Sequence, residues 1–234
     1  MGSEMCIRDR LKAIEQTFVI RFPKQSLATF GVTNIKYYVV TEPIYADGDE
    51  REGVVRTGQV TSERPAIITP NYFNSIEGFS SDAYDFFREV ARDQGPNSPA
   101  IMYEYKNKPE NLEIVGGLPT EIAHNISKDL NSRQEEMSVV MVGVDELWDV
   151  ALLKFIYEFT ASSVSSNVQD FTSRGLLTPR NDLGGIPAAA AQQLEALFQE
   201  VEQGDRASVD ILKQELDRWG VFPFYQDRFL SLFR

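Results

Sequence analysis

The chain has 234 residues, of which 42 % are hydrophobic and 25 % are charged, a composition typical of a soluble globular protein with one large domain or two small ones. Its formal net charge of −12 argues against nucleic-acid binding through bulk electrostatics, because phosphate neutralisation requires clustered Lys and Arg. The chain holds one cysteine, Cys6, and one histidine, His124, which excludes internal disulfides and a cysteine-based zinc centre.

A translated sequencing adapter accounts for the first ten residues, MGSEMCIRDR. Read in one frame, with GTG as the start codon, the transposase adapter of shotgun libraries encodes Met1 through Asp9. We therefore expect residues 1–10 to be an artefact of a metagenomic, prokaryotic assembly, and the native chain, whose own N-terminus is missing, to begin near Leu11. Without Cys6, the native part of the chain is free of cysteine.

The first third of the chain predicts one helix followed by strands. Apolar residues with helical spacing predict a helix over 11–22 that ends at Pro23. An acidic turn is expected over 47–53, and Thr57-Gly58 could form a second turn inside a strand. The expected strands, which are rich in β-branched and aromatic residues, cover 35–41, 54–61 and 66–69.

The next segment predicts a helix and a hairpin. Residues 81–93 carry apolar side chains on one helical face, and a rigid Gly-Pro loop follows them. Residues 101–105 and 112–115 flank Asn107-Lys-Pro-Glu-Asn111, an arrangement typical of a β-hairpin.

The most regular pattern lies in the middle of the chain. A strand that ends at Val115 is followed by two glycines and by a helix that Pro119 opens. An apolar strand over 137–142 then leads to Gly143 and to a long helix that begins at Asp145. A fully apolar strand is typical of a parallel strand covered on both faces, so this stretch predicts one βαβ unit.

The long helix is apolar nearly all round between Leu147 and Phe159, which predicts burial in the core or at a subunit interface. The segment is too short and too charged to span a bilayer. Phe155 in particular is expected to be buried. Lys154 is expected to pair with Glu158 four residues on, although a buried lysine could also serve as a nucleophile.

The composition changes after Gly175. A loop over 177–187 is followed by three expected helices, with Gly204 and Gly220 at the positions of C-caps. The last helix is dense in aromatic residues, and either the core or a partner surface would explain them. The three helices are expected over 188–203, 207–219 and 224–233.

These patterns predict an α+β fold. Its parts are a mixed sheet with one βαβ unit over about 111–143, a long central apolar helix and a helical C-terminal subdomain. The expected domain limits are 11–175 for the α+β domain and 176–234 for the subdomain that packs on it.

The two strand–glycine–helix junctions form the candidate site. Ligands of open α/β sheets bind beyond the carboxyl ends of strands, where helix N-termini attract anions. If the two strands are neighbours, their junctions share one crevice. Ordinary turn glycines and helix caps would produce the same pattern, and no nucleotide fingerprint is present. The residues that would line the crevice are Gly116, Gly117, Thr120, His124, Gly143 and Asp145.

Asp145 and Asp149 lie four residues apart on one helical face and could hold a hard divalent cation. Arg or Lys partners from elsewhere in the chain would neutralise these carboxylates equally well. No pattern in the sequence specifies a cofactor.

The absence of a catalytic motif favours a non-enzymatic interaction or regulatory protein of the prokaryotic cytoplasm that forms a homo-oligomer. The alternative is an enzyme or ligand sensor that binds a small anionic ligand, with or without a divalent cation, in the crevice formed by 116–120 and 143–149. Neither interpretation includes a nucleic acid or a membrane as partner.

Overall fold

The computed structural model describes residues 11–43, 51–74, 88–89 and 91–233. The acidic turn expected over 47–53 and the helix expected over 81–93 lie largely outside these residues, as do residues 1–10. The contacts divide the chain into two compact units, one formed by 1–65 and 103–167 and the other by 66–102 and 168–234. The domain limits expected from the sequence stay a prediction.

The first unit is built on a five-stranded mixed sheet with the strand order β1-β7-β2-β3-β6. β2 is parallel to β7, and the other neighbouring pairs, β1–β7, β2–β3 and β3–β6, are antiparallel. The strands are β1 (Phe18–Arg21), β2 (Thr33–Thr41), β3 (Glu52–Ser62), β6 (Tyr105–Gly116) and β7 (Ser138–Gly143). β6 and β7 therefore run in the same direction, and α4 (Pro119–Ser132) connects them.

This connection confirms the predicted βαβ unit within a mixed α+β fold. The helix does not join neighbouring strands, because β2 and β3 lie between β6 and β7. β7 confirms the expectation for an apolar strand, since it lies inside the sheet and four of its residues, from Ser138 to Met141, are buried.

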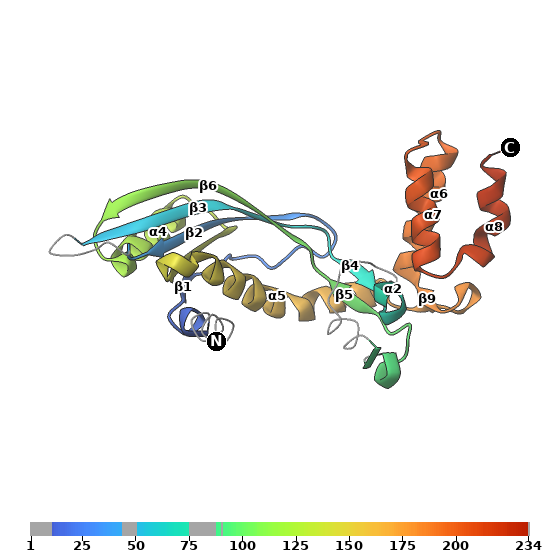
Figure 1. Ribbon diagram of the computed structural model, residues 1–234, viewed down its shortest axis with the longest axis horizontal. Coiled ribbons are helices and arrows are strands. Elements are labelled where there is room, and N and C mark those ends of the chain that lie inside the picture. Colours follow the sequence, from blue (N-terminus) through green and yellow to red (C-terminus); the bar gives the residue numbers. More distant parts are fainter. Residues whose placement is uncertain (1–10, 44–50, 75–87, 90, 234) are drawn as a thin grey trace, which may run out of the picture. The chain divides into compact units, whose positions relative to one another are not determined.

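Each face of the sheet is covered by its own helix (Figure 1). α5 (Trp148–Ser173) covers one face, which we call the α5 face, and α4 covers the opposite α4 face. The α5 face is buried through Ile35, Tyr37, Val39, Val60, Val139, Met141, Leu152, Phe155 and Phe159. The α4 face is buried through Val40, Val55, Ile122, Ala123, Leu130 and Val140. Successive residues of β2 thus point to opposite cores, as the strand pleat requires.

The central helix is buried along one face and not all round, since Leu153 and Tyr157 are 62 % and 76 % exposed. Phe155 is completely buried, and Leu152 and Phe159 are each 4 % exposed. The expected ion pair of Lys154 with Glu158 is wrong: the Lys154 ammonium donates to the backbone carbonyls of Ile14 and Thr17, at 3.1 and 2.8 Å. Residues 11–15 form a helix that ends at this point, and a lysine satisfies carbonyls at a helix C-terminus well.

Three local predictions for the first unit are wrong because tertiary pairing overrides them. The helix expected over 11–22 ends near residue 15, and Phe18–Arg21 instead form the edge strand β1. β3 continues through Thr57-Gly58 without a turn. The expected hairpin around 107–111 is one strand, β6, in which Pro109 is accommodated because the strand lies at the sheet edge and is bulged there.

The second unit contains two small two-stranded sheets and a set of short helices. β4 (Ala66–Ile68) pairs with β5 (Ala100–Met102), and β8 (Pro179–Arg180) pairs with β9 (Ile186–Pro187). Its helices are α2 (Pro70–Asn74), α6 (Ala188–Glu202), α7 (Ser208–Arg218) and α8 (Phe222–Ser231).

The three predicted C-terminal helices are confirmed, and Gly204 and Gly220 have the positive φ values of helix C-caps, 103° and 68°. Their aromatic residues form a core in which Phe198 and Leu194 are fully buried and Tyr225 and Phe229 are each 8 % exposed. Within the described residues, no helix combines the length and the apolar character that crossing a membrane requires.

Candidate functional site

The two junctions do not share a crevice. β6 ends at Gly116 and β7 ends at Gly143, and two strands separate them in the sheet. The prediction that these strands are neighbours is wrong. It failed because the β2–β3–β6 meander inserts β3 and β2 into the gap that a simple crossover would leave between its two strands.

The first junction, between β6 and α4, is occupied by backbone contacts. Gly117 has a φ of 128°, and its N–H donates to the carbonyl of Arg51 at 2.7 Å. Thr120 and His124 are exposed, and the imidazole Nδ1 of His124 lies 2.6 Å from the Thr120 carbonyl in its own helix. Gly116 lies beside a separate hollow of about 490 Å³ between the α4 face and α4. The junction therefore has the features of a helix start.

The second junction, between β7 and α5, is more closely packed. Glycine at position 143 lets α5 approach the strand closely, because a Cβ there would lie only 3.1 Å from the Cβ of Ala151 on α5. Asp145 opens a short 3₁₀ turn, Asp145–Leu147, that leads into α5 and has Val144 as its N-cap residue. Asp149 points to solvent and is exposed.

The Asp145 carboxylate is held by two neighbouring strands. Its Oδ1 accepts a hydrogen bond from Arg56 Nη1 of β3 at 2.7 Å and another from Thr41 Oγ1 of β2 at 2.6 Å. Arg56 Nη1 also donates to Thr41 Oγ1 at 2.9 Å. The side chains of Arg56 and Asp145 are only 17 % and 14 % exposed, so this ion pair is shielded from water far more than a surface pair.

An aromatic wall stands next to this pair. The Arg56 guanidinium lies 5.9 Å from the ring centroid of Trp148, the first residue of α5. The indole in turn stacks on the Tyr37 ring of β2, with centroids 6.4 Å apart and an interplanar angle of 26°. Three segments distant in the sequence thus place a guanidinium and two aromatic rings together on the α5 face.

These residues line a cavity of about 580 Å³. Tyr37, Arg56 and Trp148 form one part of its wall. The other part comes from β3 and the edge strand β6 and consists of Thr57, Pro109, Glu110, Asn111 and Leu112. Cavities of this size, with aromatic walls and a few convergent polar groups, are typical of small-molecule sites.

Tyr37 lines the cavity, but its hydroxyl is itself buried and has almost no accessible surface. Tyr37 is 1 % exposed, and its hydroxyl is the one buried side-chain polar atom of the described residues that has no hydrogen-bond partner. Burial raises the pKa of this hydroxyl; the Asn107 side chain opposes the rise, and the Glu110 carboxylate adds to it. The hydroxyl therefore stays protonated at neutral pH and can both donate and accept a hydrogen bond.

Gly58 makes room for this hydroxyl. A Cβ at position 58 would lie 2.4 Å from Tyr37 Oη and 2.6 Å from the Lys108 carbonyl oxygen, so the tyrosine reaches the backbone of β3. Opposite Gly58 the register of β6 slips: Thr57 pairs with Asn111 and Gly58 with Pro109, which leaves Glu110 as the extra residue of a bulge. Bulges are frequent beside functional sites because they redirect side chains.

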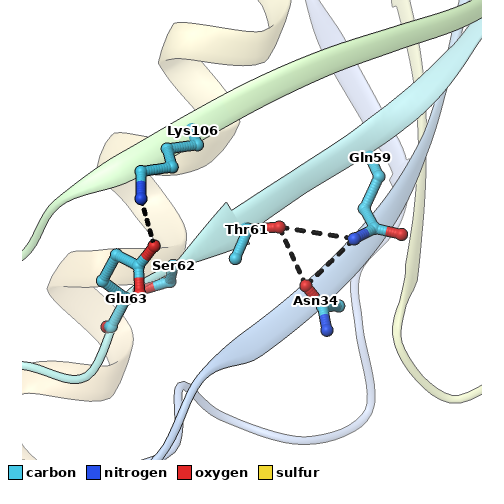
Figure 2. A network of polar contacts seen from close by, with 6 residues as sticks. All are labelled: Asn34, Gln59, Thr61, Ser62, Glu63 and Lys106. Atoms are coloured by element: carbon cyan, nitrogen blue, oxygen red, sulfur yellow. Dashed lines mark hydrogen bonds and ion pairs between the residues drawn. The ribbon is translucent and has the colours of Figure 1, made fainter.

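A second group of polar side chains in this unit has a different character (Figure 2). Asn34 Oδ1 accepts hydrogen bonds from Gln59 Nε2 at 3.0 Å and Thr61 Oγ1 at 2.8 Å, and Lys106 pairs with Glu63 at 2.7 Å. These contacts are exposed, and their donors and acceptors satisfy one another. They form a solvated polar surface of the sheet.

Of the site residues predicted from the sequence, only Asp145 lies beside the cavity, where it bonds to Arg56. Two signals in the sequence were available: Arg56 is a charged residue inside a strand of β-branched residues, and a glycine inside a strand, here Gly58, indicates close approach of another group. The stacking of Trp148 on Tyr37 joins positions 111 residues apart, and no local pattern encodes it.

The predicted metal ligands lie close in sequence but differ in environment. Asp145 is paired with Arg56, while Asp149 is exposed. Among residues 11–43, 51–74, 88–89 and 91–233, no three His, Cys, Asp or Glu side chains gather in a way that could hold a metal ion.

Comparisons of the chain with protein-family models, with curated proteins and with solved structures find no match. No residue role is therefore transferred to this chain from another protein. The geometry and chemistry of the cavity residues carry the functional proposal.

Proposed function

We propose that this protein is a non-enzymatic regulatory protein that binds a small molecule in the cavity beside Trp148. The observation that carries the proposal is the cavity of about 580 Å³, which Trp148, Arg56 and residues of the edge strand β6 line together. A cavity of this size with an aromatic wall and a few polar groups is typical of a small-molecule site.

Two features favour binding over catalysis. The Arg56 guanidinium is already paired with Asp145, so its charge is engaged before any ligand arrives. The raised pKa of Tyr37 keeps its hydroxyl protonated, so it is a poor general base near neutral pH. Glu110, at the bulge, is the only carboxylate that lines the cavity, which leaves an acid–base pair incomplete among the described residues.

A thermal-shift screen of a metabolite library tests the proposal. A compound present at a hundred times its Kd should raise the free energy of unfolding by about 2.7 kcal/mol. Leu112→Arg should abolish that shift, because position 112 lines the cavity and is 54 % exposed, so the larger side chain fills the cavity mouth without disturbing the core.

Ile114→Arg is the matched control. Position 114 lies on the same strand and face, is 56 % exposed and does not line the cavity, so the ligand-induced shift should persist. A compound that stabilises both variants equally binds elsewhere. A library in which no compound distinguishes the two variants would contradict the proposal.

We also propose that the chain forms a homo-oligomer through β6. This edge strand is 12 residues long, and in the described part of the chain no strand pairs with its outer side. Lys106 and Lys108 lie toward its start, and Glu110 and Glu113 follow toward its end. Antiparallel pairing of two copies would lay each half against the opposite half of the other copy, which brings opposite charges together.

Light scattering coupled to size-exclusion chromatography tests this interface. Lys108→Glu should shift the chain toward the monomer, and the double variant Lys108→Glu/Glu113→Lys should restore the oligomer. A monomeric wild-type chain at about 100 µM, a concentration far above the Kd of a stable dimer, would rule the interface out.

A further inference from the structure

We propose that a second site, the hollow of about 490 Å³ beside α4, binds an amphipathic molecule with an aliphatic body and a carboxylate head. The site goes beyond the proposed function, because it opens on the α4 face, whereas Trp148 stands on the α5 face. The two cavities share Thr57 and Asn111 and no other lining residue. The hollow also differs from the crevice expected from the sequence, since no residue of 143–149 lines it.

The hollow lies where α4 leaves the sheet uncovered. α4 packs mainly against β7 and β2, so the α4 face of β3 and β6 stays partly open. Side chains of β2, β3, β6 and α4 line the hollow, and all of these elements belong to the first unit. The site is therefore contained in one unit, and its lining has an apolar end and a polar end.

The end next to α4 is aliphatic. It is lined by Val55 and Val115 of the sheet and by Ile122 and Ile126 of the helix. Val115 and Ile126 are only partly buried, so they still have apolar surface in contact with water. A Cβ at Gly116 would meet no atom of the described residues within 4 Å, so the backbone leaves this end open. An aliphatic chain placed here would remove apolar surface from water, which favours binding.

The other end is polar and carries a positive charge. Thr57 of β3 pairs directly with Tyr38 of β2, and Lys36 is the preceding residue of β2 on the same face. Lys36 and Thr57 are therefore diagonal neighbours, about 7–8 Å apart and within reach of one ligand group. Within the described part of the chain, no carboxylate pairs with the Lys36 ammonium, which lies 5.6 Å from the centroid of the Tyr38 ring. A carboxylate head can bind this ammonium and accept a hydrogen bond from Thr57.

The one carboxylate that lines the hollow, Glu113, lies away from this end. It is two strands and two steps of the sheet from Lys36, a separation of roughly 15 Å by strand spacing and rise. Its Oε1 accepts a hydrogen bond from Asn111 Nδ2 at 2.7 Å. Lys108, two strands across from Lys36 in the same row, adds a second positive charge at the polar end. The local charge there favours an anionic head over a cationic one.

A series of eight-carbon probes tests this class. Octanoate, octanamide and octylammonium share the chain and differ in the charge of the head, and acetate supplies the head alone. Binding to the full chain is measured by titration with ligand-observed saturation-transfer NMR. We expect octanoate to bind at least tenfold more tightly than octylammonium or acetate. The net charge of −12 would by itself favour octylammonium, so a preference for octanoate reports the local charge of the hollow. Equal or tighter binding of octylammonium would overturn the inferred class.

Lys36→Gln tests the contact with the head. It should weaken octanoate binding about tenfold and leave octanamide binding unchanged, because only the charged head loses its partner. Lys106→Gln is the matched control: Lys106 lies on the same face, pairs with Glu63 and does not line the hollow (Figure 2). Octanoate should bind this variant as it binds the wild type. An equal loss in both variants would show an effect of overall charge and would refute the role of Lys36.

Asn125→Trp tests the location. Asn125 is exposed on α4 and lines the hollow, so the indole should fill the hollow without disturbing the core and abolish octanoate binding. His124→Trp, at the preceding exposed position that does not line the hollow, should leave binding intact. If Leu112→Arg abolishes octanoate binding and Asn125→Trp does not, octanoate occupies the cavity beside Trp148. The second site is then overturned while the proposed function stands.

A lipid surface can present the same chemistry as a free carboxylate, and sedimentation separates the two sources. Phosphatidylcholine vesicles that contain oleate should not carry the chain into the pellet, because the hollow takes a single molecule from solution. Sedimentation that Asn125→Trp abolishes, in a chain that does not bind octanoate, would assign the hollow to a membrane surface and overturn the proposal.

Discussion

The junction between β6 and α4 and the junction between β7 and α5 share a sequence pattern, a strand followed by glycine and then a helix, yet they differ in their surroundings. At the first, Gly117 bonds to backbone and His124 turns back on its own helix. At the second, Asp145 bonds to Arg56 and Thr41 from two other strands and stands beside the cavity.

The difference arises from the position of each strand in the sheet. β6 is an edge strand, so its end has a neighbour on one side only, whereas β7 lies inside the sheet beside β2. A helix that starts after an interior strand can exchange contacts with side chains of the adjacent strands. A strand–glycine–helix pattern therefore predicts a turn. Whether the turn lies at a binding site depends on the side chains that the neighbouring strands supply.

The largest expected effect comes from breaking the core beneath the second junction. Phe155 is completely buried between α5 and the sheet, and its ring contacts Phe159 at 5.3 Å between centroids. Phe155→Ala should lower the free energy of unfolding by about 3–5 kcal/mol through lost transfer energy and cavity formation. Urea denaturation measures this change. Tyr157→Ala, two residues on and 76 % exposed, should change stability by less than about 0.5 kcal/mol.

The next effect separates the two carboxylates of the second junction. Asp145→Asn removes the charge that balances the shielded Arg56 guanidinium and should lower the free energy of unfolding by about 2 kcal/mol. Asp149→Asn, at an exposed position four residues on, should leave it within about 0.5 kcal/mol. Equal losses in both variants would favour a shared cation at the two carboxylates over the ion pair with Arg56.

A smaller effect tests the unpartnered hydroxyl in the free protein. Tyr37→Phe removes a buried group that makes no hydrogen bond, so it should leave the stability unchanged or raise it by up to about 1 kcal/mol. Tyr103→Phe should instead lower it by about 1 kcal/mol, because the amide of Asn167, 1 % exposed, loses its acceptor. A clear loss in Tyr37→Phe would mean that the hydroxyl has a structural partner.

A comparison of the wild type with Tyr37→Phe at different pH values gives a further test. Burial raises the pKa of Tyr37 above its ordinary value of 10.0, so the folded state holds this proton more tightly than the unfolded state. The resulting stability is present below pH 10 and is lost as the pH rises through the raised pKa. Wild type should therefore lose stability relative to Tyr37→Phe between about pH 9 and pH 11, as measured by thermal denaturation.

Periodicity predicted the elements whose local pattern and tertiary role agree. β7 is apolar because it is an interior strand, and α5 is apolar because it covers the sheet, so both were evident from the sequence. Pro109 and Gly58 indicated turns, but in the structure both lie inside strands. Pairing across the sheet stabilises the extended conformation at these positions and outweighs the local preference.

The candidate site was harder to predict than the fold. Asp145 was found because it follows a strand and a glycine, but its partners lie 89 residues away at Arg56 and 104 residues away at Thr41. The strand order β1-β7-β2-β3-β6 decides these contacts, and several orders satisfy the same hydrophobic pattern.

The smallest effect is expected at the first junction. His124 and Thr120 are exposed, and their one contact is internal to α4, so His124→Ala should change the free energy of unfolding by less than about 0.5 kcal/mol. Phosphate should stabilise wild type and His124→Ala equally, because the His124 ring is turned to the Thr120 carbonyl of its own helix and takes no part in binding an anion. Thermal denaturation over a phosphate titration measures both quantities. Stabilisation by phosphate that disappears in His124→Ala would show that the edge junction binds an anion after all, and the contrast between interior and edge strands would then fail.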